Sequence, residues 1–191
     1  ILQYESAVLA KKAYEFYLTL DNVEYVEPDI IVRVQSDIEV PNEFVPEIMP
    51  EGSASEVFDW LSDKIGFNDI KECLKERIAD DYVLVATIDS GADIDHDLLK
   101  DRVFDSGVNM SGTGNPSSCD DDYGHGTHVA GIIVSNTLDN VKIMPYKVLN
   151  DEGKGSLSAI AVAVDMAVED GADIINMSLT AKGESARMTE A

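Results

Sequence analysis

The chain has 191 residues, 45% of them hydrophobic, which is enough for one domain with a buried core and a small additional unit. Its formal net charge of −23 argues against nucleic acid as a partner, because the phosphates would be repelled. No apolar run reaches the roughly 18 residues of a membrane span, and two cysteines are too few for a disulfide scaffold. Free thiols at Cys73 and Cys119 are favoured over a disulfide between them.

The first 20 residues are expected to form an amphipathic helix, because apolar residues recur at helical steps on one face: Leu9, Ala13, Phe16 and Leu20. Alternating residues over 23–34 then favour a strand, in which Pro28 marks an edge or a bend. Residues 35–55 carry several prolines and acids without a lasting period, which predicts a linker.

Residues 56–79 predict a helix in two pieces, broken near Gly66. The unbroken apolar run over 83–88 that follows is typical of a parallel strand buried on both faces. This run ends at Asp89, which would therefore lie at the carboxyl edge of the sheet, where the ligand sites of open α/β sheets gather.

His125 lies at the expected start of a helix over residues 124–134, flanked by Gly124 and Gly126, whose small size lets other groups approach. An aspartate at a strand end and a histidine at a helix start suit general-base catalysis. The carboxylate of Asp89 would fix the imidazole tautomer, and the other ring nitrogen would face a nucleophile. The alternative is a capping aspartate and a helix-start histidine with structural duties only.

Two further strands are expected over residues 141–149 and 173–179, with a helix over 157–170 between them. Ser156 can cap this helix, and Gly171 follows its end. Repeated strand–helix–strand units imply right-handed crossovers. The expected fold class is therefore α/β, with an open, mostly parallel sheet and helices on both faces.

Three motifs, in this order, resemble the subtilisin-like serine proteases. The aspartate and histidine motifs are Val85-Ala86-Thr87-Ile88-Asp89-Ser90-Gly91 and His125-Gly126-Thr127-His128-Val129-Ala130-Gly131. A third block, Asp173-Ile174-Ile175-Asn176-Met177-Ser178-Leu179, is similar to the substrate-binding strand of that family. The order of aspartate before histidine is also the order that this family uses.

The resemblance implies a serine endopeptidase, a hydrolase with polypeptide substrates, in which His125 is the general base and then the general acid and Asp89 orients it. The Gly-Thr-Ser nucleophile motif and the oxyanion asparagine of the family do not follow in this sequence. The chain is accordingly expected to be an internal fragment of a precursor that is inactive by itself and prone to self-association. The alternative is a non-catalytic relative with a binding or regulatory role.

Residues 22–29 resemble the carboxyl-terminal strand of subtilase propeptides, which are small α+β domains that chaperone and inhibit the protease. The implied division is a propeptide remnant in residues 1–36, a linker in 37–55 and the first half of a catalytic domain in 56–191. The propeptide would then be a partner of its own enzyme. In the family the junction passes through the active-site cleft, so Phe44-Val45 and Ile48-Met49 are candidates for contact, with a solvated linker as the alternative.

The same resemblance places two edges of a substrate cleft at Gly153 with Gly155 and at Ser178 with Leu179. Each edge would pair with an extended peptide through backbone hydrogen bonds, which supply affinity, while side-chain pockets supply selectivity. The alternative for the glycines is a plain turn. Thr180 stands where the family usually has glycine, which leaves substrate selectivity open.

The acid-rich residues 92–97 invite a metal-binding interpretation, but they lack the glycine and the distal glutamate of a calcium loop. The spacing of His125 and His128 suggests zinc, yet no third ligand pattern accompanies it. We therefore expect no cofactor, with a calcium-binding module on residues 92–97 as the weaker alternative. The resemblance further implies a secreted or cell-surface protein.

Overall fold

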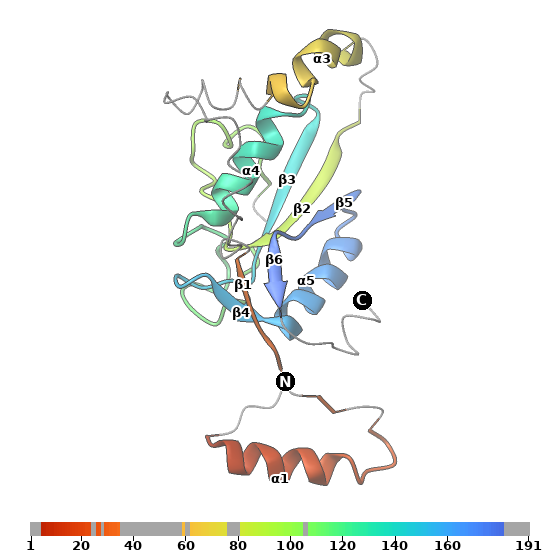
Figure 1. Ribbon diagram of the computed structural model, residues 1–191, viewed down its shortest axis with the longest axis vertical. Helices are drawn as coiled ribbons and strands as arrows, with labels where there is room; N and C mark the ends of the chain where they lie inside the picture. The colour runs from red at the N-terminus through yellow and green to blue at the C-terminus, as the bar shows by residue number, and fades with distance from the viewer. Residues whose placement is uncertain are drawn as a thin grey trace, which may run out of the picture.

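The computed structural model describes residues 5–23, 26–27, 29–34, 59, 62–75, 81–104 and 107–181. Figure 1 shows the helices and strands that these residues form. In chain order they are α1 (Ala7–Tyr17), β1 (Ile31–Val34), α3 (Phe67–Lys75), β2 (Val83–Asp89), α4 (His125–Ser135), β3 (Val141–Lys147), β4 (Lys154–Ser156), α5 (Leu157–Glu169), β5 (Ile174–Asn176) and β6 (Leu179–Ala181).

The first sheet has the strand order β3-β2-β5 and is parallel throughout. Its central strand β2 pairs with β3 over its whole length, from Val83 opposite Val141 to Asp89 opposite Lys147. Every residue of β2 after Val83 is buried, as expected for an apolar run covered on both faces. The prediction of a parallel α/β sheet is confirmed.

Helices cover both faces of this sheet, because alternate residues of β2 belong to different parts of the core. Ala86 and Ile88 pack in a cluster that contains Ile160 and Ala163 of α5. Val85 packs in a second cluster that contains Ala130 and Val134 of α4 and Leu99 of the preceding loop. In Figure 1, α4 and α5 accordingly lie on different sides of β2.

The second sheet is antiparallel, with the order β4-β1-β6, and it corrects the expected end of the chain. Residues 173–179 were expected to form one strand, but β5 ends at Asn176 and the chain enters the second sheet at Leu179. The continuous apolar and small residues hid this change of sheet, because periodicity alone does not show where a strand leaves its neighbour. The expected strand over 23–34 is likewise shorter, with β1 limited to Ile31–Val34 among the described residues.

The amino-terminal helix forms as predicted but buries none of its residues. Ser6 caps it by accepting a hydrogen bond from the amide of Leu9 at 3.3 Å. The apolar side chains of Leu9 and Phe16 remain exposed, and Figure 1 shows α1 apart from both sheets. Among the described residues before Gln35, those that contact the rest of the fold include β1 and the two residues before it, since Asp29 accepts hydrogen bonds from Ser158 and the carbonyl oxygen of Ile30 accepts one from the amide of Leu157.

The break predicted near Gly66 is confirmed, since Gly66 has φ +72° and separates helical residues 62–64 from α3. Ser156 caps α5 as expected, accepting a hydrogen bond from the amide of Ala159 at 3.2 Å. The two cysteines are not joined by a disulfide, and Cys73 is exposed while Cys119 is buried. Among the described residues, no helix combines the length and the apolar character needed to cross a membrane.

Candidate active site

The structure brings together the two residues that the sequence singles out. Asp89 is the last residue of β2, and His125 is the first residue of α4. The imidazole Nδ1 of His125 lies 2.8 Å from Oδ1 of Asp89, within hydrogen-bond distance. The aspartate side chain is 1% exposed and the histidine 19%, so the carboxylate is enclosed while the ring keeps some access to solvent.

Burial and hydrogen bonding have opposite effects on the pKa of Asp89. Burial raises the pKa of its carboxyl above the ordinary value of 3.8, while the hydrogen bonds with His125 and with the amide of Ser90 oppose that rise. The Ser90 amide donates to Oδ1 at 2.7 Å, the same oxygen that faces the imidazole. A buried carboxylate beside an imidazole favours the positive charge on the ring when the ring accepts a proton.

Two glycines allow the end of β2 and the start of α4 to touch. A Cβ atom on Gly126 would lie 2.1 Å from the carbonyl oxygen of Gly91. Gly91 has φ +106°, and a Cβ atom there would lie 2.2 Å from the carbonyl oxygen of Cys119. A side chain on Gly126 would therefore push the start of α4 away from the segment that follows Asp89, and a side chain on Gly91 would push that segment away from the backbone at Cys119.

The turn before His125 is fixed by Asp121, whose role the sequence reasoning missed. Its Oδ1 accepts hydrogen bonds from the amides of Tyr123 and Gly124 at 3.0 and 2.8 Å. Its Oδ2 accepts from the amide and hydroxyl of Thr127 at 2.9 and 2.6 Å. Burial alone would raise the pKa of Asp121, but these hydrogen bonds hold it below the ordinary value of 3.8. An aspartate just ahead of a helix start is a capping signal and could have indicated it.

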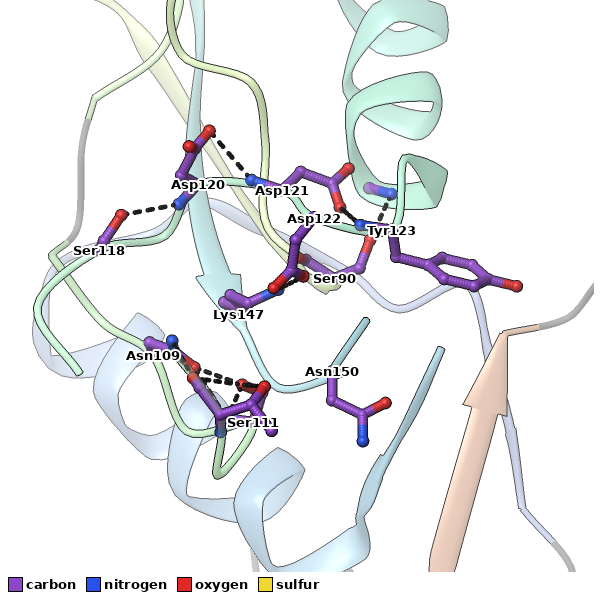
Figure 2. A network of polar contacts seen from close by, with 12 residues as sticks. Ser90, Asn109, Ser111, Ser118, Asp120, Asp121, Asp122, Tyr123, Lys147 and Asn150 are labelled. Carbon is purple, nitrogen blue, oxygen red and sulfur yellow. Dashed lines mark hydrogen bonds and ion pairs between the residues drawn. The ribbon is translucent and has the colours of Figure 1, made fainter. Parts of the chain in front are cut away.

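Lys147, the last residue of β3, is a buried cation that the sequence reasoning also missed. Its Nζ donates hydrogen bonds to the carbonyl oxygen of Ser90 at 2.7 Å and to Oδ1 of Asp122 at 2.5 Å. In Figure 2 the side chain of Lys147 extends toward both of these residues. A lysine at the carboxyl end of a largely buried strand was the available signal, but its partners lie far away in the sequence.

The expected cleft edges flank an extended segment, and that segment belongs to the chain itself. Strand β1 lies between β4 and β6, with Val32 opposite Gly155 on one side and Ala181 on the other. Val34 lies opposite Leu179, and its amide donates to the carbonyl oxygen of Gly153 at 3.3 Å. Gly153, Gly155 and Leu179 thus line β1.

Ser178, the fourth expected edge residue, precedes β6, and its hydroxyl accepts a hydrogen bond from the side chain of Asn176 at 3.3 Å. A segment in the cleft was expected from residues 35–55, including Phe44-Val45 and Ile48-Met49. Those residues lie outside the described part of the chain, and the segment seen in place is Ile31–Val34.

The proposed metal ligands make other contacts. Oδ1 of Asp93 accepts from the amide of Asp95 at 3.2 Å, and Nδ1 of His96 accepts from the amide of Leu98 at 3.2 Å. His128 is exposed on α4. In the part of the chain that the structure describes, no three histidine, cysteine, aspartate or glutamate residues are grouped to hold a metal ion.

Comparisons with known proteins identify the family. A model of the subtilase family matches residues 80–191. The cell wall-associated protease of Bacillus subtilis strain 168 is 33% identical over 186 residues, which cover 91% of this chain and 20% of that protein. The halolysin-like extracellular serine protease Nep of Natrialba magadii is 36% identical over 54% of this chain and 22% of its own length.

Subtilisin DY of Bacillus licheniformis is 36% identical over 120 residues, 57% of this chain and 41% of that protein. The crystal structure of a cold-adapted subtilisin-like serine proteinase has 31% sequence identity and a TM-score of 0.48, covering 56% of this chain and 40% of that one. The chain therefore spans between 20% and 41% of the length of these three relatives. With the family model matching more than half of its residues, the chain belongs to the subtilase family of serine proteases.

Proposed function

We propose that the protein containing this chain is a serine endopeptidase of the subtilisin type, with Asp89 and His125 as two members of its catalytic triad. The observation that carries the proposal is the 2.8 Å contact between Nδ1 of His125 and the enclosed carboxylate of Asp89. A non-catalytic relative is not favoured, because nothing in the pair departs from the geometry that catalysis needs.

The contact defines the direction of proton transfer. When Nδ1 carries a proton and donates a hydrogen bond to the Asp89 carboxylate, Nε2 has a free lone pair. Nε2 can then take the proton of a serine hydroxyl. The serine oxygen then attacks the carbonyl carbon of the peptide bond, and the imidazolium gives its proton to the leaving amine. The nucleophile belongs to a part of the protein outside this sequence, since no Gly-Thr-Ser motif occurs in it. We therefore expect no turnover from the 191-residue chain alone.

We further propose that residues 1–36 act as a propeptide that occupies the substrate cleft of its own enzyme, with 37–55 as the linker and 56–191 as part of the catalytic domain. Support comes from β1, which pairs with β4 on one side and β6 on the other as an extended substrate would. In this interpretation Gly153, Gly155, Ser178 and Leu179 form the substrate-binding edges. Relatives named as extracellular or cell wall-associated support a secreted or cell-surface location.

The experiment compares three forms of the complete protein, after removal of the propeptide, on a panel of fluorogenic peptides. His125→Ala should lower kcat by a factor on the order of 10⁶, the effect known for the catalytic histidine of subtilisin itself. His128→Ala is the matched control, because it changes an exposed histidine one turn along the same helix and should keep normal turnover. Activity that survives His125→Ala would refute the proposed role.

A further inference from the structure

Lys147 is a buried cation beside the Asp89–His125 pair. It is the Cα partner of Asp89 in the parallel register of β2 and β3, so both residues stand at the carboxyl edge of the sheet. Its side chain is only 2% exposed. An ammonium group withdrawn from water persists only when it is paired and hydrogen-bonded. The groups that it contacts therefore indicate what it stabilises.

One contact of Lys147 reaches the segment that carries the aspartate. Its Nζ donates to the backbone carbonyl of Ser90 at 2.7 Å. Ser90 directly follows Asp89, and its amide donates to Oδ1 of Asp89 at 2.7 Å. The Ser90 hydroxyl also accepts from the amide of Gly126 at 2.9 Å, the residue after His125. Ser90, whose carbonyl oxygen accepts from Lys147, is thus also hydrogen-bonded to Asp89 itself and to Gly126, the neighbour of His125.

The other contact reaches the turn that carries the histidine. The Nζ atom forms an ion pair with Asp122, which lies three residues before His125. The neighbouring residue Asp121 fixes the remainder of that turn through the amides of Tyr123 and Gly124. The side chain of Lys147 is nearly enclosed, while that of Asp122 is about half exposed. The buried lysine therefore restrains the position of the turn that contains Asp122.

We propose that Lys147 is a positioning residue for catalysis, a single ammonium that ties the peptide after Asp89 to the turn before His125 and so holds the pair in register. Asp89 and His125 are 36 positions apart in the sequence and come from different elements, so their 2.8 Å contact depends on how those elements are joined. The expected loss of turnover on substitution of Lys147 rests on the proposed peptidase function. The expected loss of the Asp89–His125 hydrogen bond does not rest on it.

The first test compares Lys147→Met with Lys142→Met in the complete, processed protein. Lys142 lies on the same strand and also donates to a backbone carbonyl, that of Asp101 at 2.8 Å, but at the opposite end of β3. Lys147→Met should lower kcat by about 10²-fold, the effect of misplacing catalytic groups by about 1 Å. KM should stay unchanged, because the ammonium of Lys147 donates to Ser90 and Asp122, which belong to neither β4 nor β6, and Lys142→Met should retain normal kcat.

The second test does not require activity and uses the 191-residue chain. The proton on Nδ1 of His125 should give a slowly exchanging, low-field NMR signal in the original chain and in Lys142→Met, and Lys147→Met should lose it. Asp122→Ala should weaken the same signal, since it removes one of the two contacts through which Lys147 joins the segments. If Lys147→Met does not fold, Asp122→Ala alone decides the question.

Two results would overturn the proposal. One is a folded Lys147→Met variant that keeps both the Nδ1 signal and the kcat of Lys142→Met. The other is an Asp122→Ala variant with an unchanged signal. Absence of peptidase activity in the unaltered complete protein, with the signal behaving as described, would instead refute the proposed function and leave the positioning role of Lys147 standing.

Discussion

The amide of Val34 donates a hydrogen bond to the carbonyl oxygen of Gly153 at 3.3 Å, which places the end of β1 next to the Tyr123 ring that covers Gly153. Tyr123 lies two residues before His125. In Figure 2 the arrow of β1 points toward this tyrosine. Strand β1 therefore runs toward Tyr123 and the Asp89–His125 pair, the direction that the proposed occupation of a substrate cleft requires.

The docking of β1 between β4 and β6 should depend on its two buried side chains, Val32 and Val34. Val32 is 1% exposed and packs in the core cluster of β2 and α5, whereas its neighbour Ile31 is 66% exposed. Val32→Asp should release β1, because the carboxylate would have to leave water. Hydrogen exchange at the amides of residues 32 and 34 should then accelerate, while that of Thr87 in β2 stays slow. Ile31→Asp is the control, and equal acceleration in both variants would contradict the docking.

Asp121 should stabilise the chain in a pH-dependent way. Its pKa is lowered in the folded state, so its contribution is fully present above the unfolded pKa of about 3.9 and is lost as the pH falls through the lower folded pKa. At pH 7, Asp121→Ala should reduce the free energy of unfolding by about 1–2 kcal/mol, as for other capping residues. Urea unfolding at pH 7 and pH 3 should show this difference shrinking at the lower pH. A difference that is constant or larger at pH 3 would contradict the assignment, and Asp120→Ala serves as the exposed control.

The buried carboxylate of Asp89 should cost stability at neutral pH. Its folded pKa is raised, so the folded state loses stability as the pH rises from the unfolded value through the higher folded value. Asp89→Asn should therefore stabilise the chain at pH 7 by roughly 0.5–2 kcal/mol, the usual size of such gains. In the complete protein the same change should lower kcat by about 10⁴-fold. Chemical unfolding and peptide turnover measure the two effects, and a variant that is less stable at pH 7 would contradict the pKa direction.

Residues 92–97 are expected to bind no calcium tightly. Calorimetric titration at physiological salt should reveal no site with a dissociation constant below about 10⁻⁴ M, the weak end of protein calcium sites. A submicromolar site that disappears on Asp93→Ala would overturn this expectation.

The sequence was sufficient to place Asp89 at the end of a strand and His125 at the start of a helix, because each stands at a recognisable boundary, the end of an apolar run and the start of a helix after glycine. It was also sufficient for the parallel sheet, whose strands and helices alternate along the chain. Lys147 and Asp121 were missed because their importance lies in hydrogen bonds formed only after folding. Lys147 reaches Ser90 across 57 positions and Asp122 across 25.

The position of β1 was predicted only in part for a related reason. Alternation over residues 23–34 indicates a strand, but local pattern does not specify a partner strand more than 100 residues later in the chain, such as Leu179–Ala181. For α1, the spacing of apolar residues predicted the helix itself. It did not predict that the apolar face would remain unburied.

The most direct test of the central claim is covalent labelling of the complete, processed protein with a fluorophosphonate, which reacts with a serine that a neighbouring base has activated. Peptide mass spectrometry should locate the label on one serine outside the 191 residues described above. Labelling should be retained in His128→Ala and lost in His125→Ala. Equal labelling of the His125→Ala variant, or no labelling of the unaltered protein, would contradict the account of Asp89 and His125 as the pair that activates the nucleophile.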